Sequence, residues 1–269
     1  MKSFFETEYS ALYNGDCINV MKELISNNIK VDKIITSPPY NIIRPNSTDR
    51  GYDIYKDGMD NKSYMKWITD IFECYDDILN KNGCVLWNMS YGCENTDLMS
   101  LCIAEIIKKT NFKLADIIIW KKNTATPNNV SSNKMTRICE FVYVFCRENE
   151  FHTFTSRKKV IGYREDTNQK IYENKFNFFE AKNNDNSTQL NKATFSTEFV
   201  DELIDRYVED DDIVLDNFSG TGTTMYACEC RNIRSINIEL SANQCDYATK
   251  RIKKGIQTNL FNYLEECEE

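Results

Sequence analysis

The chain has 269 residues, enough for one α/β domain with insertions or for at most two small domains. Its composition, 41% hydrophobic and 28% charged, is that of a soluble globular protein and excludes a disordered or fibrous one. The net charge of −8 excludes a uniformly basic surface for nucleic acid, although a sum over the whole chain does not describe local clusters.

Helices and strands alternate through the first half of the sequence. Residues 41–61 are polar and without a clear period, which indicates a mobile loop. The apolar spacing predicts helices over 18–26, 62–79 and 96–110, and strands over 31–36, 84–88, 115–120 and 140–146.

Residues 149–192 differ in kind, because they are aromatic, basic and rich in asparagine, with a low-complexity run at 182–188. They are interpreted as an insertion or small subdomain. Beyond them the pattern predicts a helix over 197–208, an acidic turn at 209–212, a strand over 213–215, a glycine loop, a helix from 223, a strand over 234–238 and a final helix to 254.

This alternation predicts an α/β fold with a doubly wound, mostly parallel sheet. We expect one domain in two halves, 1–148 and 193–258, separated by the insertion 149–192 and followed by an acidic tail, 259–269.

Charge is distributed unevenly along the chain. Residues 1–106 contain ten basic and sixteen acidic side chains, for a net charge of −6. Residues 107–182 contain fifteen basic and eight acidic side chains, a net charge of +7, and residues 183–269 carry −9. The basic stretch includes the insertion, which fits either a surface that faces a polyanion or a solvated charged face.

Cysteine usage and the start of the chain suggest a cytoplasmic location. None of the eleven cysteines forms a C-x-x-C pair, so we expect buried, reduced thiols. The single histidine, His152, cannot complete a usual zinc set, and no metal is expected. The first residues lack the apolar core of a signal peptide, and no apolar run approaches the length of a membrane span.

A glycine loop lies between a predicted strand and a predicted helix. It reads DNFSGTG at 216–222 and leads into Thr223. Such glycines allow a ligand to approach the backbone, and the helix N-terminus offers unpaired N–H groups. Glu239 ends the next strand, where a carboxylate can accept hydrogen bonds from ribose hydroxyls. The loop has neither the lysine of a Walker motif nor a full pyrophosphate fingerprint, so a nucleoside such as S-adenosylmethionine fits best, with a purely structural turn as the alternative.

A second motif, TSPPYN at 36–41, follows the predicted strand 31–36. Two prolines fix the backbone and remove its donors, so that a hydroxyl and a carbonyl can serve as neighbouring acceptors. The ring of Tyr40 adds a flat stacking surface. Together these groups suit a planar base that carries an exocyclic amino group. In an open α/β sheet the carboxyl ends of the strands meet at one crevice, so Ser37, the loop 217–222 and Glu239 are expected to share a site.

With these motifs the chain resembles the β class of amino-group DNA methyltransferases, in which the S-P-P-Y motif precedes the cofactor loop. The resemblance covers most of residues 11–254 and leaves out the insertion and the tail. Further matching segments are YNGDC at 13–17, GCVLWN at 83–88, WKK at 120–122, RICEF at 137–141 and INIE at 236–239.

The resemblance implies a Rossmann-like methyltransferase fold with a small inserted target-recognition region. It implies that S-adenosylmethionine methylates an exocyclic base nitrogen. The implied catalytic residues are Ser37, Pro38, Pro39 and Tyr40, with Ser37 Oγ and the Pro38 carbonyl accepting the amino hydrogens and Tyr40 stacking on a base flipped out of double-stranded DNA. The implied cofactor-binding residues are Asp16, Phe195, Asp216, Asn217, Phe218, Gly220, Gly222, Thr223 and Glu239.

Some expectations concern specificity and partners. A serine before P-P-Y is more typical of the cytosine-N4 members than of the adenine-N6 members, so cytosine-N4 is favoured. The basic and aromatic insertion suits DNA contact, with Arg157, Lys158, Lys159 and Arg164 as candidate phosphate ligands. A restriction endonuclease of the same system is a candidate partner, and both a monomer and a homodimer fit.

Two positions depart from the family pattern. Asn217 stands where D-P-F has proline, and KATF at 192–195 replaces an H-P-x-x-F type segment. Both are expected to pack on the cofactor. The alternatives are therefore a methyltransferase of the same fold that acts on RNA or a protein amide, and a non-catalytic protein that binds S-adenosylmethionine or DNA.

Overall fold

The structure is a computed structural model that describes residues 2–41, 58–91, 95–125, 128, 132–185 and 194–266. Most of the loop expected at 41–61, the end of the run 182–188, Lys192 and the last three residues of the tail lie outside this description.

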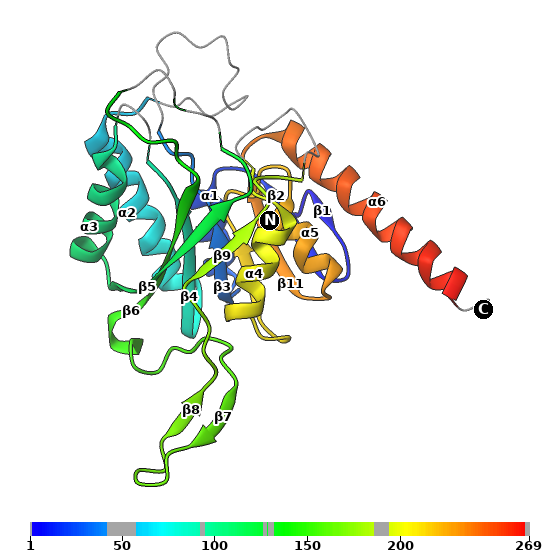
Figure 1. The fold of residues 1–269 in the computed structure, drawn as a ribbon. Coiled ribbons are helices and arrows are strands. Elements are labelled where there is room, and N and C mark those ends of the chain that lie inside the picture. The colour runs from blue at the N-terminus through cyan, green and yellow to red at the C-terminus, as the bar shows by residue number, and fades with distance from the viewer. Residues whose placement is uncertain are drawn as a thin grey trace.

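Within the described residues, nine strands form one twisted sheet in the order β1-β2-β11-β10-β3-β4-β6-β5-β9 (Figure 1). Strands β2, β11, β10, β3 and β4 run parallel, β6 is antiparallel to both of its neighbours, and β9 is parallel to β5. The predicted doubly wound, mostly parallel sheet is confirmed. Its strands are β1 (Phe5–Glu6), β2 (Ser10–Asn14), β3 (Val31–Thr36), β4 (Leu79–Met89), β5 (Phe112–Lys122), β6 (Cys139–Arg147), β9 (Phe178–Ala181), β10 (Ile213–Asp216) and β11 (Arg234–Glu239).

Helices cover both faces of the sheet, α1 to α3 on one face and α4 to α6 on the other (Figure 1). Successive residues of a strand point to opposite faces, so Ile34 joins the core under α1 to α3, whereas Ile35 joins the core under α4 and α5. Burial on both faces explains why these strands are continuous apolar runs in the sequence. The helices are α1 (Cys17–Ser26), α2 (Asn61–Ile78), α3 (Asp97–Lys109), α4 (Thr197–Tyr207), α5 (Thr223–Cys230) and α6 (Ala242–Glu266).

The helix starts follow from local capping. The carboxylates of Asp16 and Asp60 accept hydrogen bonds of 3.0 Å from the backbone N–H groups of Asn19 and Ser63. Ser196 caps α4 in the same way. Each cap satisfies an N–H group that has no partner within its own helix.

Three elements differ from the sequence-based expectation. The N-terminal strands β1 and β2 were not predicted, and β2 pairs with β11 beside the glycine loop. Helix α6 continues to Glu266 rather than ending at 254, so most of the expected acidic tail is helical. No proline interrupts residues 255–266, so the backbone there can stay helical.

The insertion divides into two parts. The strands β7 (Val160–Tyr163) and β8 (Lys170–Tyr172) form a separate antiparallel hairpin, preceded by the short 3-10 helix η1 (Glu148–Glu150). Strand β9, in contrast, is an edge strand of the main sheet and pairs with β5. The hairpin projects away from the body (Figure 1).

Thiol burial follows the expectation except at two positions. Among the described cysteines, all are free, Cys230 is exposed and Cys139 is partly exposed. In the same part of the chain no helix is long and apolar enough to cross a membrane. No group of three His, Cys, Asp or Glu side chains in the described ranges could hold a metal ion.

Candidate active site

The predicted site residues meet at one edge of the sheet. Ser37 follows the carboxyl end of β3, and Asp216 and Glu239 end the parallel strands β10 and β11. Because β6 runs antiparallel to β4, its first residues lie at the same edge, and Phe141 is paired with Met89 at the end of β4. Residues 180 positions apart in the sequence touch there, since the Thr36 hydroxyl donates a 2.7 Å hydrogen bond to Asp216.

Asp216 is a buried carboxylate that organises this edge. It accepts hydrogen bonds from the hydroxyls of Thr36 and Thr224, at 2.7 and 2.6 Å, and from the backbone N–H of Phe218 at 3.1 Å. Burial raises the pKa of this carboxyl to about 6, although these three hydrogen bonds act to lower it. Asp216 thus joins the end of β3, the glycine loop and the start of α5.

The glycine loop is held against β11 through Glu239. One carboxylate oxygen accepts from the backbone N–H of Gly220 and the other from that of Ser241, both at 2.8 Å. Gly222 has φ +75°, and a Cβ at this position would lie 2.7 Å from the Cβ of Ala248. Only glycine fits this left-handed and crowded position, which lets the chain turn directly into α5.

The glycine loop contains buried polar groups that have no hydrogen-bond partner among the residues that the structure describes. These are Asn217 Nδ2, Ser219 Oγ and Thr221 Oγ1. Buried polar atoms in folded proteins are nearly always hydrogen-bonded, so three orphaned groups in one loop indicate a place for a polar ligand. Together with the carboxylate of Glu239, they fit the amino acid and ribose groups of a nucleoside such as S-adenosylmethionine.

The departure at Asn217 is accommodated within the core. The side-chain oxygen of Asn217 accepts a 2.6 Å hydrogen bond from the buried hydroxyl of Tyr75. The next residue, Phe218, lies beside Trp67 and Trp87, with ring centroids 5.5 and 6.4 Å apart. The loop is therefore anchored by a hydrogen bond where the family pattern has a proline. The KATF departure begins at Lys192, outside the described residues.

The other predicted cofactor-binding residues lie at the same edge but have additional contacts. Asp16 is exposed and caps α1, while Phe195 packs on Phe199 at the start of α4, with ring centroids 4.9 Å apart. The Thr223 hydroxyl accepts a 3.0 Å hydrogen bond from Arg251. Their expected contacts with a cofactor stay predictions.

Cys17 follows Asp16 and is inert. The side chain is 6% exposed, and burial raises the pKa of its thiol to about 12. A thiol in this environment is not a nucleophile at neutral pH.

The S-P-P-Y turn is rigid. Pro38 and Pro39 are buried, and the Pro39 carbonyl accepts a 2.6 Å hydrogen bond from the hydroxyl of Tyr64 on α2. The side chain of Asn41 accepts from the backbone N–H groups of Gly58 and Met59, at 2.9 Å each, and so closes the base of the loop. Sequence reasoning missed Tyr64 and the anchoring role of Asn41, because neither belongs to a recognisable pattern with its partner.

The Tyr40 hydroxyl is the centre of a polar network. Ser37 Oγ donates to it at 3.2 Å, and it lies 3.0 Å from Asn88 Oδ1 and 3.2 Å from Glu140 Oε2. The other oxygen of Glu140 forms an ion pair with Lys122. Asn88, Lys122 and Glu140 belong to the matching segments, but the sequence alone did not connect them to Tyr40. Stacking of the Tyr40 ring on a base stays a prediction.

The structure does not bring the predicted DNA-binding residues to this site. The backbone N–H of Arg157 donates to the carbonyl of Arg206, and its side chain pairs with Glu209 and Asp210, just before the amino end of β10. Lys158, Lys159 and Arg164 are exposed around the hairpin that follows. All four therefore lie at the edge opposite Ser37. They lie there because β6 carries the chain across the sheet before the insertion begins, and their contact with DNA stays a prediction.

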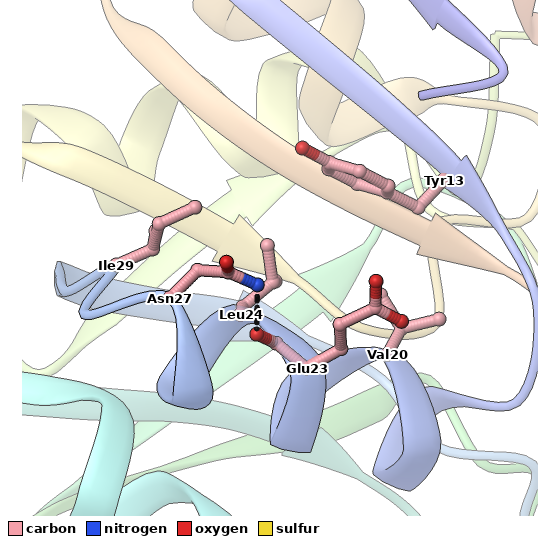
Figure 2. A pocket seen from close by; sticks show the side chains of 6 residues that line it. All are labelled: Tyr13, Val20, Glu23, Leu24, Asn27 and Ile29. Carbon is pink, nitrogen blue, oxygen red and sulfur yellow. Dashed lines mark hydrogen bonds between the residues drawn. The ribbon is translucent and has the colours of Figure 1, made fainter. Parts of the chain in front are cut away.

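A cavity of about 260 Å³ lies elsewhere, between α1 and β2 (Figure 2). It contains none of the predicted site residues, and its lining is part apolar and part polar. Its lining residues are Tyr13, Val20, Glu23, Leu24, Asn27 and Ile29.

Comparisons with known proteins identify the family and relatives of the chain. A family model described as DNA methylase, for N6 and N4 methyltransferases, matches residues 31–250. The Type II methyltransferase M.BglII of Bacillus subtilis is 22% identical over 91% of this chain and 69% of its own length. The Type II methyltransferase M.Cfr9I of Citrobacter freundii is 24% identical over 95% of this chain and 91% of its own length.

Solved structures share the fold. The PvuII DNA methyltransferase, described as cytosine-N4-specific, has a TM-score of 0.71 with 16% identity and covers 92% of this chain and 88% of its own. The M1.HpyAVI–SAM complex has a TM-score of 0.63 with 24% identity, over 90% of this chain and 98% of its own. These likenesses show that the fold is that of class I methyltransferases.

Proposed function

Because the chain belongs to the N6/N4 DNA methylase family, we propose that it methylates an exocyclic amino nitrogen of a base in double-stranded DNA, with S-adenosylmethionine as the methyl donor. The observation that carries this proposal is the meeting of the S-P-P-Y turn and the glycine loop at one edge of the sheet, linked by the hydrogen bond between Thr36 and Asp216.

The glycine loop would hold S-adenosylmethionine. Glu239 would accept from the ribose hydroxyls, Asn217, Ser219 and Thr221 would supply polar groups, and Asp16 would contact the adenine. When bound, this molecule supplies an activated methyl group on a sulfonium, which leaves readily as a thioether. The contribution of the chain is to orient that group towards the target nitrogen and to exclude water.

The S-P-P-Y turn would hold the base. The target nitrogen is a poor nucleophile, because its lone pair is delocalised into the ring. Ser37 Oγ and the Pro38 carbonyl would accept its two hydrogens, which favours a tetrahedral nitrogen with a free lone pair. The base must be flipped out of the duplex to reach this turn, and Tyr40 would stack on it.

We propose cytosine-N4 rather than adenine-N6 as the target. The serine at position 37 is the feature that supports this choice, because it is more typical of cytosine-N4 members of the family. Mass spectrometry of nucleosides from DNA methylated by the protein tests it directly. We expect N4-methylcytosine; N6-methyladenine as the product contradicts the choice of base but not the reaction.

DNA contact by the insertion 149–192 is a separate proposal. Lys158, Lys159 and Arg164 are exposed and could bind phosphates, whereas Arg157 already pairs with two carboxylates. Since the hairpin lies at the opposite edge from Ser37, it would contact DNA away from the base pocket of its own chain.

The relatives named Type II methyltransferases suggest a role in restriction and modification. We propose that the chain protects its own sequence from a partner endonuclease. Genomic DNA from cells that express the protein should then resist a restriction enzyme that cuts the methylated sequence, and the S37A variant should give no protection.

A further inference from the structure

The hydroxyl groups at the site form a directed chain that ends on a carboxylate. Ser37 Oγ donates to the Tyr40 hydroxyl over 3.2 Å, and the Tyr40 hydroxyl reaches Glu140 Oε2 over a further 3.2 Å. Because the hydroxyl hydrogen of Ser37 is donated to Tyr40, the lone pairs of its oxygen can accept a hydrogen from the base. The chain of donors therefore leads from the position of the target nitrogen to Glu140.

We propose that Glu140 takes up the proton that the methylated nitrogen must lose, through the hydroxyls of Ser37 and Tyr40. This inference rests on the proposed function, because the proton arises in that reaction. Glu140 acts through Tyr40 and does not touch the base, so it is a positioning residue that also stores a proton.

The step balances in atoms and charge. As the nitrogen–carbon bond forms, the carbon–sulfur bond breaks and its electron pair stays on sulfur. The nitrogen then carries a methyl group, two hydrogens and a positive charge. It passes one hydrogen to Ser37 Oγ, which passes its own to the Tyr40 oxygen, which passes its own to Glu140. The nitrogen ends neutral, both hydroxyls are regenerated and the carboxylate becomes a carboxylic acid.

Neighbouring side chains suit Glu140 to this role. Asn88 also lies within 3.0 Å of the Tyr40 hydroxyl, but an amide oxygen cannot take the proton, and its Nδ2 donates to the Phe141 carbonyl, which fixes its orientation. A carboxylate is the stronger acceptor of the two. Lys122 and Tyr40 are charged or titratable groups that contact Glu140.

Glu140 can also return the proton to water. Its side chain is 14% exposed, which is enough for exchange with solvent. Lys122 pairs with Oε1 of this carboxylate, so Oε2 is the oxygen that faces the Tyr40 hydroxyl.

The test is the single-turnover rate of methyl transfer in E140Q, with S-adenosylmethionine and DNA bound. Glutamine keeps the size and one acceptor oxygen but cannot take the proton. We expect a loss of about 10²-fold, the usual range for general-base catalysis. The matched control is E180Q, because Glu180 also pairs with a lysine of β5, Lys121, at 2.7 Å, yet has no hydrogen bond to Tyr40.

The pH dependence separates proton uptake from a merely structural role. Between about pH 6 and about pH 9, hydroxide can replace the missing acceptor, so the deficit of E140Q should shrink as pH rises. Titration calorimetry with S-adenosylmethionine should give the same Kd for E140Q and the wild type.

The carboxyl group of Glu140 can also be observed directly by ¹³C NMR, without measuring activity. In protein labelled with ¹³C at the glutamate carboxyl groups, the Glu140 signal is assigned by its loss in E140Q. We expect the Y40F variant, without cofactor, to shift this signal, since the hydrogen bond from the hydroxyl is lost.

A rate for E140Q within twofold of the wild type, a deficit that is constant with pH, or an unshifted signal in Y40F each overturns the relay. A wild-type protein that methylates no DNA overturns the proposed function and the relay with it, whereas an active wild type with a normal E140Q overturns the relay alone.

Discussion

The edge of the sheet that carries Ser37 and the hairpin at the opposite edge differ in how their side chains are buried and paired. At the first, buried polar side chains are tied to one another across distant segments, as Asp216 is to Thr36 and Thr224. At the hairpin, large apolar side chains such as Ile161 and Tyr163 are 66% and 56% exposed. A rigid network of buried polar groups suits chemistry that depends on position, whereas an exposed apolar and basic surface suits contact with another molecule.

The largest expected difference between the two regions is in activity. The Y40A variant removes both the ring and the centre of the hydroxyl network, so methyl transfer should fall by roughly 10³-fold. The matched change in the hairpin is Y172A, since Tyr172 is 48% exposed. At saturating DNA we expect Y172A to transfer methyl groups at nearly the wild-type rate. Equal losses in the two variants would remove the distinction between the regions.

A glycine-to-alanine substitution should lower the free energy of unfolding much more in the glycine loop than in the hairpin. In G222A the new Cβ meets Ala248 at 2.7 Å in a left-handed backbone, so the free energy of unfolding should fall by roughly 2 to 4 kcal/mol. In G162A, on β7, the nearest atom is Ile171 Cδ1 at 3.9 Å, and the change should be within about 0.5 kcal/mol. Urea denaturation measures both. A G222A protein as stable as G162A would contradict the fit described for the glycine loop.

The buried carboxyl of Asp216 predicts a pH effect. Burial raises its pKa in the folded protein to about 6, above the ordinary value of 3.8 for an aspartate carboxyl, so the folded state binds this proton more tightly than the unfolded state does. Protonation of Asp216 therefore adds up to about 3 kcal/mol to the free energy of unfolding below about pH 4. This contribution is lost as pH rises through about 6. Many carboxyls titrate in this window. The comparison is therefore with D216N, and the unfolding free energy of the wild type minus that of D216N should decrease as pH rises.

The smallest expected effect is on DNA affinity. Replacing Lys158 and Lys159 together with alanine should weaken DNA binding modestly and reduce the slope of log K against log salt by about 2. The control is the double change of the exposed Lys108 and Lys109 at the end of α3. Fluorescence anisotropy over a salt series measures both. An unchanged slope in the hairpin variant indicates that this surface does not bind DNA.

Much of the fold could be predicted from the sequence because its strands are buried on both faces. The strand 31–36 was predicted with the bounds that the structure has, since it is a compact apolar run ended by Ser37 and two prolines. Strand β2 was missed because SALYN is short and mixed, and it is stabilised by pairing with β11, more than 200 residues away.

The site was predictable where a motif lies within one segment and not where it depends on contacts across the sheet. The S-P-P-Y turn and the glycine loop are local patterns. The network that joins Tyr40 to Glu140 depends on β6 running antiparallel to β4, which no local pattern specifies. The same reversal places the start of the insertion at the far edge, so the distance of the basic residues from the S-P-P-Y turn could not be predicted from the sequence.

The central claim is that one edge of the sheet binds the methyl donor and transfers its methyl group to DNA. Incubation of duplex DNA with S-adenosylmethionine carrying a ³H-methyl group tests it most directly, with wild-type and S37A proteins compared and the binding of the donor measured in parallel by calorimetry. We predict that both proteins bind the donor, and that label enters DNA only with the wild type. Equal labelling by S37A, or labelling of RNA or protein rather than DNA, would contradict the account.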